Sequence, residues 1–271
     1  IGAVSKEQIR KYHAGHYTLP NMVVAAAGNV EQAELVRLSE KYLAEGDNKA
    51  PAAHAIPAPE VPSKAAESAC FYEKDTQQYH VCFGGLGLSR HAGERFTLSI
   101  LDSILGSSAS SRLFQEVREK RGLAYSVYSY SSLYSDTGLV GVYYGCRGES
   151  VAEVAKIVVD QIESLMNDTI DETELERAKE NAKGRVVLGM ETTHSRMSRL
   201  GKLTVTDSEI LLLDSIIERI NQVTADDVMT MASRYFDPKR LTAVAIGPDA
   251  GVFEKALAIL NGERELQVKK V

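Results

Sequence analysis

The sequence predicts an α+β fold: an antiparallel sheet with helices packed on one side, preceded by a truncated copy of the same fold. The first observation is an internal repeat, because residues 4–28 and 223–247 align without a gap at an offset of 219 residues (223 − 4) and both end in glycine. The second is a group of early strand-like runs, and the third is a turn that joins two alternating runs as an antiparallel pair. A self-match at this spacing indicates two tandem domains of one fold.

The repeat sets the predicted domain organisation. By the same period, we expect the first copy to need roughly 200 further residues before Ile1. Residues 1–43 are therefore predicted to be the C-terminal end of a truncated first domain. Residues 44–66 contain four prolines and many alanines, which favours a semi-extended linker. Residues 67–271 are predicted to be a complete second domain.

In residues 1–43, helix-capping residues and the spacing of apolar residues predict the secondary structure. Ser5 and Gln8 have the spacing of a capping box at the start of a helix. Asn21 to Ala27 is a short apolar run that predicts a strand. Glu31 to Leu43 carries one apolar stripe and predicts a second helix.

The elements of the second domain follow in order along the chain. Apolar and aromatic runs predict strands at 68–75 and 77–88. Alternation over 123–133, a turn at 135–138 and a run to Cys146 predict an antiparallel hairpin. Apolar stripes and capping-box spacings predict helices at 94–105, 111–120, 150–166, 169–190, around Arg196 and at 210–220, before the second repeat copy closes the domain.

Composition excludes several classes of function. The net charge is −6 with a pI near 5.6, which argues against nucleic acid or an anionic membrane as the main partner. No apolar run approaches the roughly 20 residues that span a bilayer, and the first residues lack the pattern of a signal peptide. The three scattered cysteines indicate free thiols in a reducing compartment, so we expect a cytoplasmic protein.

Two motifs resemble binding sites, but their residues favour a purely structural role. His13 and His16 share one helix face, as a zinc pair would. They lack a third ligand and a general base nearby, and no HxxEH or HExxH motif occurs, so we expect no metal ligand in this chain. The small residues at 106–111 precede a helix without the lysine of a phosphate loop, which favours a tight connection.

Residues 114–130, FQEVREKRGLAYSVYSY, carry the strongest local signal. Gly122 suits the left-handed residue that ends a helix. Arg118 and Tyr125 on either side of that end are two hydrogen-bond donors able to hold a carbonyl oxygen. On composition alone, a solvated charged helix followed by a half-buried aromatic strand is the stronger interpretation.

The run SSRLFQEVREKRGLAYSV, together with QIRKYHAGHYTLPNMVVAAAGNV near the start, resembles the C-terminal, zinc-free half of the pitrilysin and mitochondrial processing peptidase family. The resemblance covers essentially the whole chain and is strongest to the bacterial, processing-peptidase-like branch. It implies two α+β halves that form a clamshell. It also implies an HxxEH zinc site in the first half, upstream of Ile1, with the zinc bound there in the parent protein and none in this chain.

The resemblance also implies a role for Arg118 and Tyr125, which match the family's R-x6-Y pattern and would bond the substrate carbonyl near the scissile bond. We therefore expect the substrate-binding half of a zinc-dependent endopeptidase that cleaves peptides or unstructured segments. Its expected partners are its own N-terminal half, a peptide substrate and a second subunit in a homo- or heterodimer. The alternatives are a non-catalytic core subunit of a processing or respiratory complex, and a stand-alone binding domain.

Overall fold

The computed structural model describes residues 2–43, 68–262 and 267–270. By their internal contacts these residues form two compact units. The smaller contains residues 2–43 and 187–210, and the larger contains the remaining described residues. The predicted linker, residues 44–66, lies outside the described residues, so the domain boundary placed there stays a prediction.

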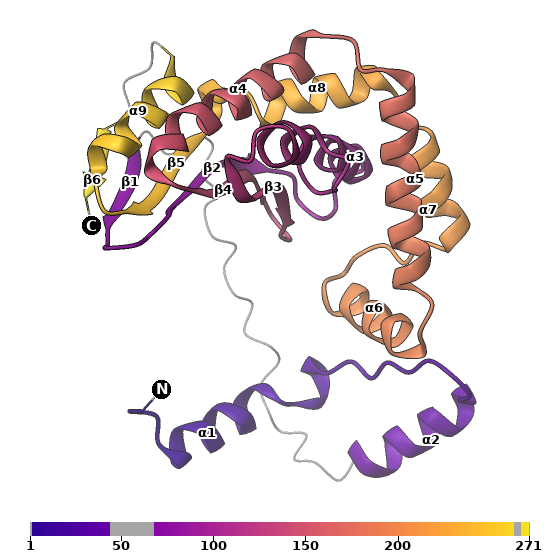
Figure 1. Cartoon of the computed structure of the whole chain (residues 1–271). Coiled ribbons are helices and arrows are strands. Elements are labelled where there is room, and N and C mark those ends of the chain that lie inside the picture. The colour runs from indigo at the N-terminus through magenta and orange to yellow at the C-terminus, as the bar shows by residue number, and fades with distance from the viewer. Residues whose placement is uncertain (1, 44–67, 263–266, 271) are drawn as a thin grey trace. The chain divides into compact units, whose positions relative to one another are not determined.

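The larger unit is built on one sheet of six strands (Figure 1). In spatial order they are β3 (Ala124–Leu133), β4 (Gly138–Cys146), β2 (Tyr79–Gly87), β5 (Thr242–Gly247), β1 (Ser68–Glu73) and β6 (Gln267–Lys270). The pairs β3–β4, β4–β2 and β2–β5 are antiparallel, which confirms the predicted hairpin. Strand β5 inserts between β1 and β2, which run in opposite directions. Its pairing with β1 is therefore parallel, as is that of β6 with β1.

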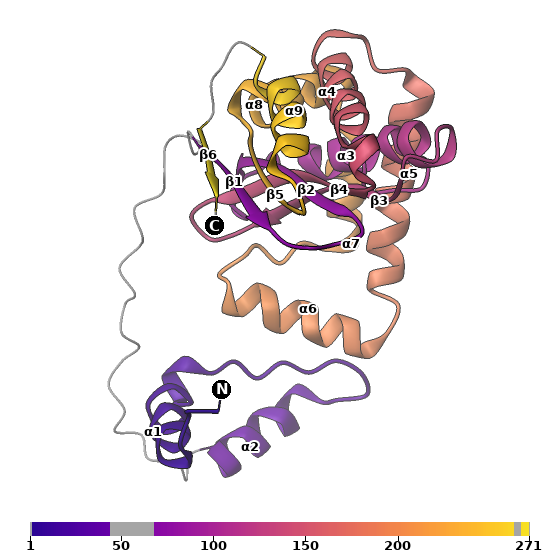
Figure 2. The ribbon, with the colours of Figure 1, turned by 60° about the vertical axis from the view of Figure 1, so that its left-hand side comes forward.

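Helices cover one face of this sheet (Figure 2). They are α3 (Arg95–Leu105), α4 (Val151–Asn167), α8 (Ala225–Tyr235) and α9 (Ala250–Asn261). Their apolar stripes meet the inward residues of the strands, so that Phe71, Phe83 and Phe253 are fully buried between the layers. The α+β prediction is confirmed, although α9 and β6 were not among the predicted elements.

Further elements complete the larger unit and connect it to the smaller one. Helix α5 (Glu172–Gly189) passes from one unit to the other, α7 (Leu213–Asn221) packs on α3, and short turns lie at η3 (Gly148–Ser150) and η4 (Pro238–Arg240). None of the helices within the described residues has the length and apolar character needed to cross a membrane.

Two predicted helix starts differ from the structure. Ser150 precedes α4, but its side chain makes no capping bond, because its backbone is helical rather than extended and it closes the η3 turn. Helix α5 begins at Glu172, so the Thr169–Glu172 spacing is not a capping box at its first turn.

The helix and the short turn of the internal repeat recur in the structure at equivalent positions. Helix α1 (Lys6–His16) and η1 (Leu19–Asn21) have the same bounds as α8 and η4 after the offset of 219 residues (225 − 6 and 238 − 19). Both helices begin with a complete capping box, formed by Ser5 with Gln8 and by Thr224 with Asp227. The first copy of the repeat is followed by α2 (Gln32–Leu43).

The strand predicted over Asn21–Ala27 is not formed. Met22 has an extended backbone, but no ladder partner lies among the described residues, and a strand exists only through such pairing. Its counterpart in the second copy, β5, has partners on both sides. The same contrast holds for side chains, since Ile9 is 59% exposed while the equivalent Val228 is fully buried.

Candidate functional site

The segment that carries Arg118 is a helical turn of unusual width. Residues Phe114–Glu119 (η2) form a π-helix, in which the amide of Lys120 donates to the carbonyl of Gln115 at 2.9 Å, five residues back. Val117 is fully buried and anchors the turn in the core. π-Helical turns cost hydrogen-bond geometry and frequently mark functional positions.

Gly122 ends this turn in the left-handed conformation, with φ of +63°, as the sequence predicts. Its amide donates to the carbonyl of Arg118 at 3.1 Å, and the amide of Leu123 donates to Val117 at 2.9 Å. The chain therefore reverses immediately after Arg118 and enters β3. This reversal brings Tyr125 back beside the turn.

Tyr125 lies at an irregularity in the β3–β4 pairing. Ala124 pairs with Cys146 and Ser126 with Gly145, so Tyr125 is the extra residue of a β-bulge. A bulge changes the direction of a side chain relative to the regular pleat. The phenol of Tyr125 is 76% exposed and has no part in the core.

The π-turn and the bulge bring the two predicted site residues together. The guanidinium carbon of Arg118 lies 5.0 Å from the centre of the Tyr125 ring and 4.8 Å from that of Phe114. Both distances lie within the range of cation–π attraction, which holds the guanidinium near the two rings.

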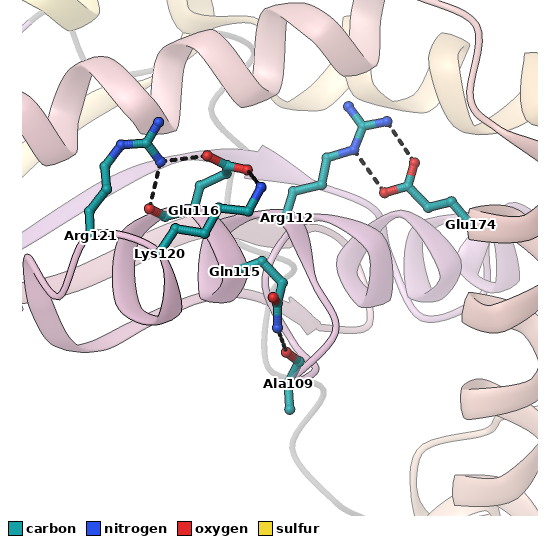
Figure 3. A network of polar contacts seen from close by, with 7 residues as sticks. All are labelled: Ala109, Arg112, Gln115, Glu116, Lys120, Arg121 and Glu174. Atoms are coloured by element: carbon teal, nitrogen blue, oxygen red, sulfur yellow. Dashed lines mark hydrogen bonds and ion pairs between the residues drawn. The ribbon is translucent and has the colours of Figure 1, made fainter.

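Two neighbouring basic residues, Lys120 and Arg121, both pair with Glu116 (Figure 3). The Glu116 carboxylate accepts hydrogen bonds from both Arg121 and Lys120, and these bonds, first that of Arg121, lower the pKa of Glu116. Among the described residues, Arg118 makes no hydrogen bond through its guanidinium, and its nearest carboxylate is that of Glu119 at 3.7 Å. Arg118 is thus the residue of this basic run that does not pair with Glu116.

A second arginine fixes the base of the turn (Figure 3). Arg112 donates to both carboxylate oxygens of Glu174 on α5, at 2.9 and 2.7 Å, and to the hydroxyl of Ser164 on α4 at 3.2 Å. Arg112 lies just before η2, so this contact ties the start of the turn to two helices. The sequence did not single out Arg112, because its partner is 62 residues away.

The connection before the turn is held by its own hydroxyls. Ser111 donates to the carbonyl of Ser108 at 2.6 Å, and Ser108 donates to the carbonyl of Ser103 at 3.2 Å. The side-chain amide of Gln115 (Nε2) also donates to the carbonyl of Ala109 at 2.8 Å (Figure 3). These bonds describe a tight connection.

The strands beside Tyr125 carry an aromatic ledge, formed by His80, Tyr128, Tyr130 and Tyr143. The ring of Tyr128 lies 4.9 Å from that of Tyr143, whose hydroxyl is 2.7 Å from Nδ1 of His80. Strand alternation places these residues opposite the inward-facing, fully buried Val81 and Phe83, on the face away from the covering helices. The ledge provides flat, half-exposed aromatic surface.

Two of the three thiols, those of Cys82 and Cys146, are not suited to nucleophilic chemistry. Burial raises the pKa of Cys146 to about 12 and also raises the pKa of Cys82, so both remain protonated at neutral pH.

A zinc ion does not fit the described residues. Nowhere within residues 2–43, 68–262 and 267–270 do three histidine, cysteine or acidic side chains gather as a metal site would require. His13 stacks on Tyr17 and His16 stacks on Tyr12, each with a neighbour on the same turn of chain. Nδ1 of His16 also lies 2.8 Å from the carbonyl of Tyr12. These two histidines pack locally.

Three comparisons with known proteins agree with this structure. A family model described as the peptidase M16 inactive domain matches residues 3–182. A Streptomyces coelicolor protein named as an uncharacterized zinc protease is 39% identical over 252 residues, which cover 92% of this chain and 54% of that protein. The chain thus spans about half the length of this curated relative.

Two solved structures share the fold. The peptidase M16 inactive domain from Pseudomonas fluorescens has a TM-score of 0.78 and 24% identity, over 92% of this chain and 58% of that one. A chain of complex III from Candida albicans has a TM-score of 0.77 and 18% identity, over 95% of this chain and 63% of that one. With 180 residues (182 − 3 + 1) matched by the family model, the chain belongs to the peptidase M16 inactive-domain family.

Proposed function

We propose that this chain is the substrate-contacting half of a zinc-dependent endopeptidase that cleaves peptides or unstructured segments between two lobes. Its relatives are named zinc proteases, and its own residues provide no metal site in the described ranges. The metal chemistry therefore belongs to a preceding lobe, which residues 2–43 complete. The exposed Ile9, Tyr12 and Tyr17 support this, because their equivalents in the second copy, Val228, Met231 and Phe236, are buried in a core.

The observation that carries the proposal is the pairing of Arg118 with Tyr125. A peptide carbonyl that becomes an oxyanion needs donors that are fixed before the reaction. The Arg118 guanidinium is a permanent charge held by two rings, and the exposed phenol of Tyr125 is a directed donor beside it. Both would approach the carbonyl near the scissile bond, while the aromatic ledge offers adjacent surface for substrate side chains.

The second candidate is a non-catalytic subunit of a larger assembly. The fold it shares with a chain of complex III from Candida albicans favours this candidate. The exposed, hydrogen-bond-free guanidinium of Arg118 favours the enzyme, because an assembly subunit has no need of two aligned donors at that position.

Kinetics of the full-length protein test the proposal. Tyr125→Phe removes one hydroxyl and should lower kcat/KM for peptide cleavage by roughly 10- to 1000-fold, mainly through kcat, as loss of one oxyanion donor does. The melting temperature should not change, since Tyr125 is exposed. Arg118→Gln should have a similar effect.

Tyr134→Phe is the matched control, because Tyr134 is 50% exposed just after β3 and lies outside the pair. It should cleave at the wild-type rate. Wild-type cleavage by Tyr125→Phe would refute the assigned role. Absence of cleavage by the wild-type protein, combined with its recovery as a stoichiometric subunit of a complex, would favour the second candidate.

A further inference from the structure

Helix α6 (Thr193–Val205) lies in the second domain predicted from the sequence, yet it belongs to the same compact unit as residues 2–43. Within that unit it runs beside the extended segment 22–28, which both views show (Figures 1 and 2). A β-carbon added at Gly201 would lie 3.4 Å from that of Ala25, and one added at Gly28 would lie 3.5 Å from Cγ2 of Thr193.

These two contacts fix the direction and register of the packing. Eight residues separate Thr193 from Gly201, which is about 12 Å along a helix at 1.5 Å per residue. Three residues separate Ala25 from Gly28, which is about 10 Å along an extended chain. The two lengths match, so the segment lies antiparallel along α6 over two helical turns.

The solvent exposure of the residues on α6 and on the extended segment agrees with this packing. Met197, which lies between Thr193 and Gly201 at steps of four residues, is half-buried, as is Gly201. In the extended segment, residues 25–27 are half-buried while residues 22–24 are exposed. Residues 25–27, the part of the segment beside Gly201, are therefore the part shielded from water, and a β-carbon at Gly201 would lie at contact distance from Ala25.

We infer that α6 is a binding surface for segment 25–28, through which the second half of the protein holds the end of the first half. The two halves are then joined at two places, by the chain itself and by this non-covalent contact. The inference rests on the α6 contacts alone and stands apart from the proposed peptidase function.

An engineered disulfide tests the contact directly. The β-carbons of an A25C/G201C variant would be about as close as the roughly 3.5–4.5 Å that a disulfide requires. Mild oxidation of the full chain should link these two cysteines in most molecules, as tryptic peptides joined under non-reducing conditions and separated by reductant. The native Cys70, Cys82 and Cys146 should stay unlinked.

The control is G15C/G201C, because a β-carbon at Gly15 meets nothing within 4 Å. It should give no intramolecular link. If A25C/G201C yields no more linked peptide than this control, the inference is overturned.

Amide hydrogen exchange gives a second test. The decisive result is whether a glycine-to-leucine substitution slows or speeds the exchange of nearby amides. Leucine favours a helix over glycine, so Gly184→Leu on α5, at a position open to solvent, should slow local exchange about 3- to 5-fold. At Gly201 the β-carbon alone would already contact Ala25, so we expect the further atoms of leucine to disturb the packing, and Gly201→Leu should speed exchange of the α6 amides about 5-fold or more. Slower exchange in α6 after Gly201→Leu would show that nothing packs there and would overturn the inference.

Discussion

The ion pair between Arg112 and Glu174 should contribute far more to stability than an ordinary surface pair. Its two bonds have the parallel geometry of a bidentate contact, and the side chains are only 16% and 17% exposed. Arg112→Ala would leave the Glu174 carboxylate largely shielded from water without its partner. It would also remove the bond that Ser164 receives.

The expected cost lies between two limits. Breaking a fully buried pair by removing one partner costs about 3–5 kcal/mol, whereas an exposed pair contributes about 0.2–1 kcal/mol. With about five-sixths of each side chain out of water, Arg112→Ala should cost about 2–3 kcal/mol. In a unit of this size each kcal/mol lowers Tm by about 2–4 °C, so the expected shift is about 4–12 °C.

Thermal unfolding followed by circular dichroism is the assay, and Arg234→Ala is the matched control. Arg234 pairs with Glu94 between two elements of the same unit, but these side chains are 56% and 52% exposed. Its loss should lower Tm by less than about 4 °C. If Arg112→Ala shifts Tm no more than Arg234→Ala does, the argument from burial is refuted.

Two further predictions concern Gly106 and Asp102, which both lie against Ser129. A β-carbon at Gly106 would lie 2.2 Å from the backbone nitrogen of Ser129, so Gly106→Ala should destabilise by about 2 kcal/mol or more in denaturant titrations, while Gly93→Ala, in open space, should be nearly neutral. Burial raises the pKa of Asp102 above its usual 3.8, against the lowering effects of the Ser129 hydrogen bond and of Arg185. A raised carboxyl pKa means that the folded state binds the proton more tightly, so this group's contribution falls as pH rises from about 4 through the folded pKa. Asp102→Asn should remove that part of the pH dependence, and an unchanged stability profile from pH 4 to 8 would contradict the assignment.

Most of the helices and strands could be predicted from the sequence, because helix caps, apolar spacing and turns depend on residues that are close together in the chain. The capping boxes at Ser5 and Thr224 and the aligned repeat copies fix helix bounds that agree exactly between α1 and α8. Strand pairing is not local, so the insertion of β5 between β1 and β2 and the parallel pairs that follow were beyond the pattern. The apolar run 22–27 looked like β5 and is not a strand among the described residues, because pairing depends on other segments.

For the candidate site as well, the sequence identified the residues but not their arrangement in space. Arg118, Gly122 and Tyr125 were identified from the sequence, and Gly122 has the predicted left-handed backbone. The π-turn and the bulge, which bring Arg118 over the Tyr125 ring, depend on tertiary packing and leave no pattern in the sequence. The contact between Arg112 and Glu174 depends on the fold in the same way.

The central claim is that this chain supplies substrate contacts and no metal site, and zinc analysis of the purified 271-residue chain tests it most directly. After dialysis against metal-free buffer, the chain should hold no stoichiometric zinc, because its described residues offer no set of three ligands and its sequence lacks HxxEH. One tightly bound zinc per chain that is lost in the His13→Ala/His16→Ala double variant would contradict the account.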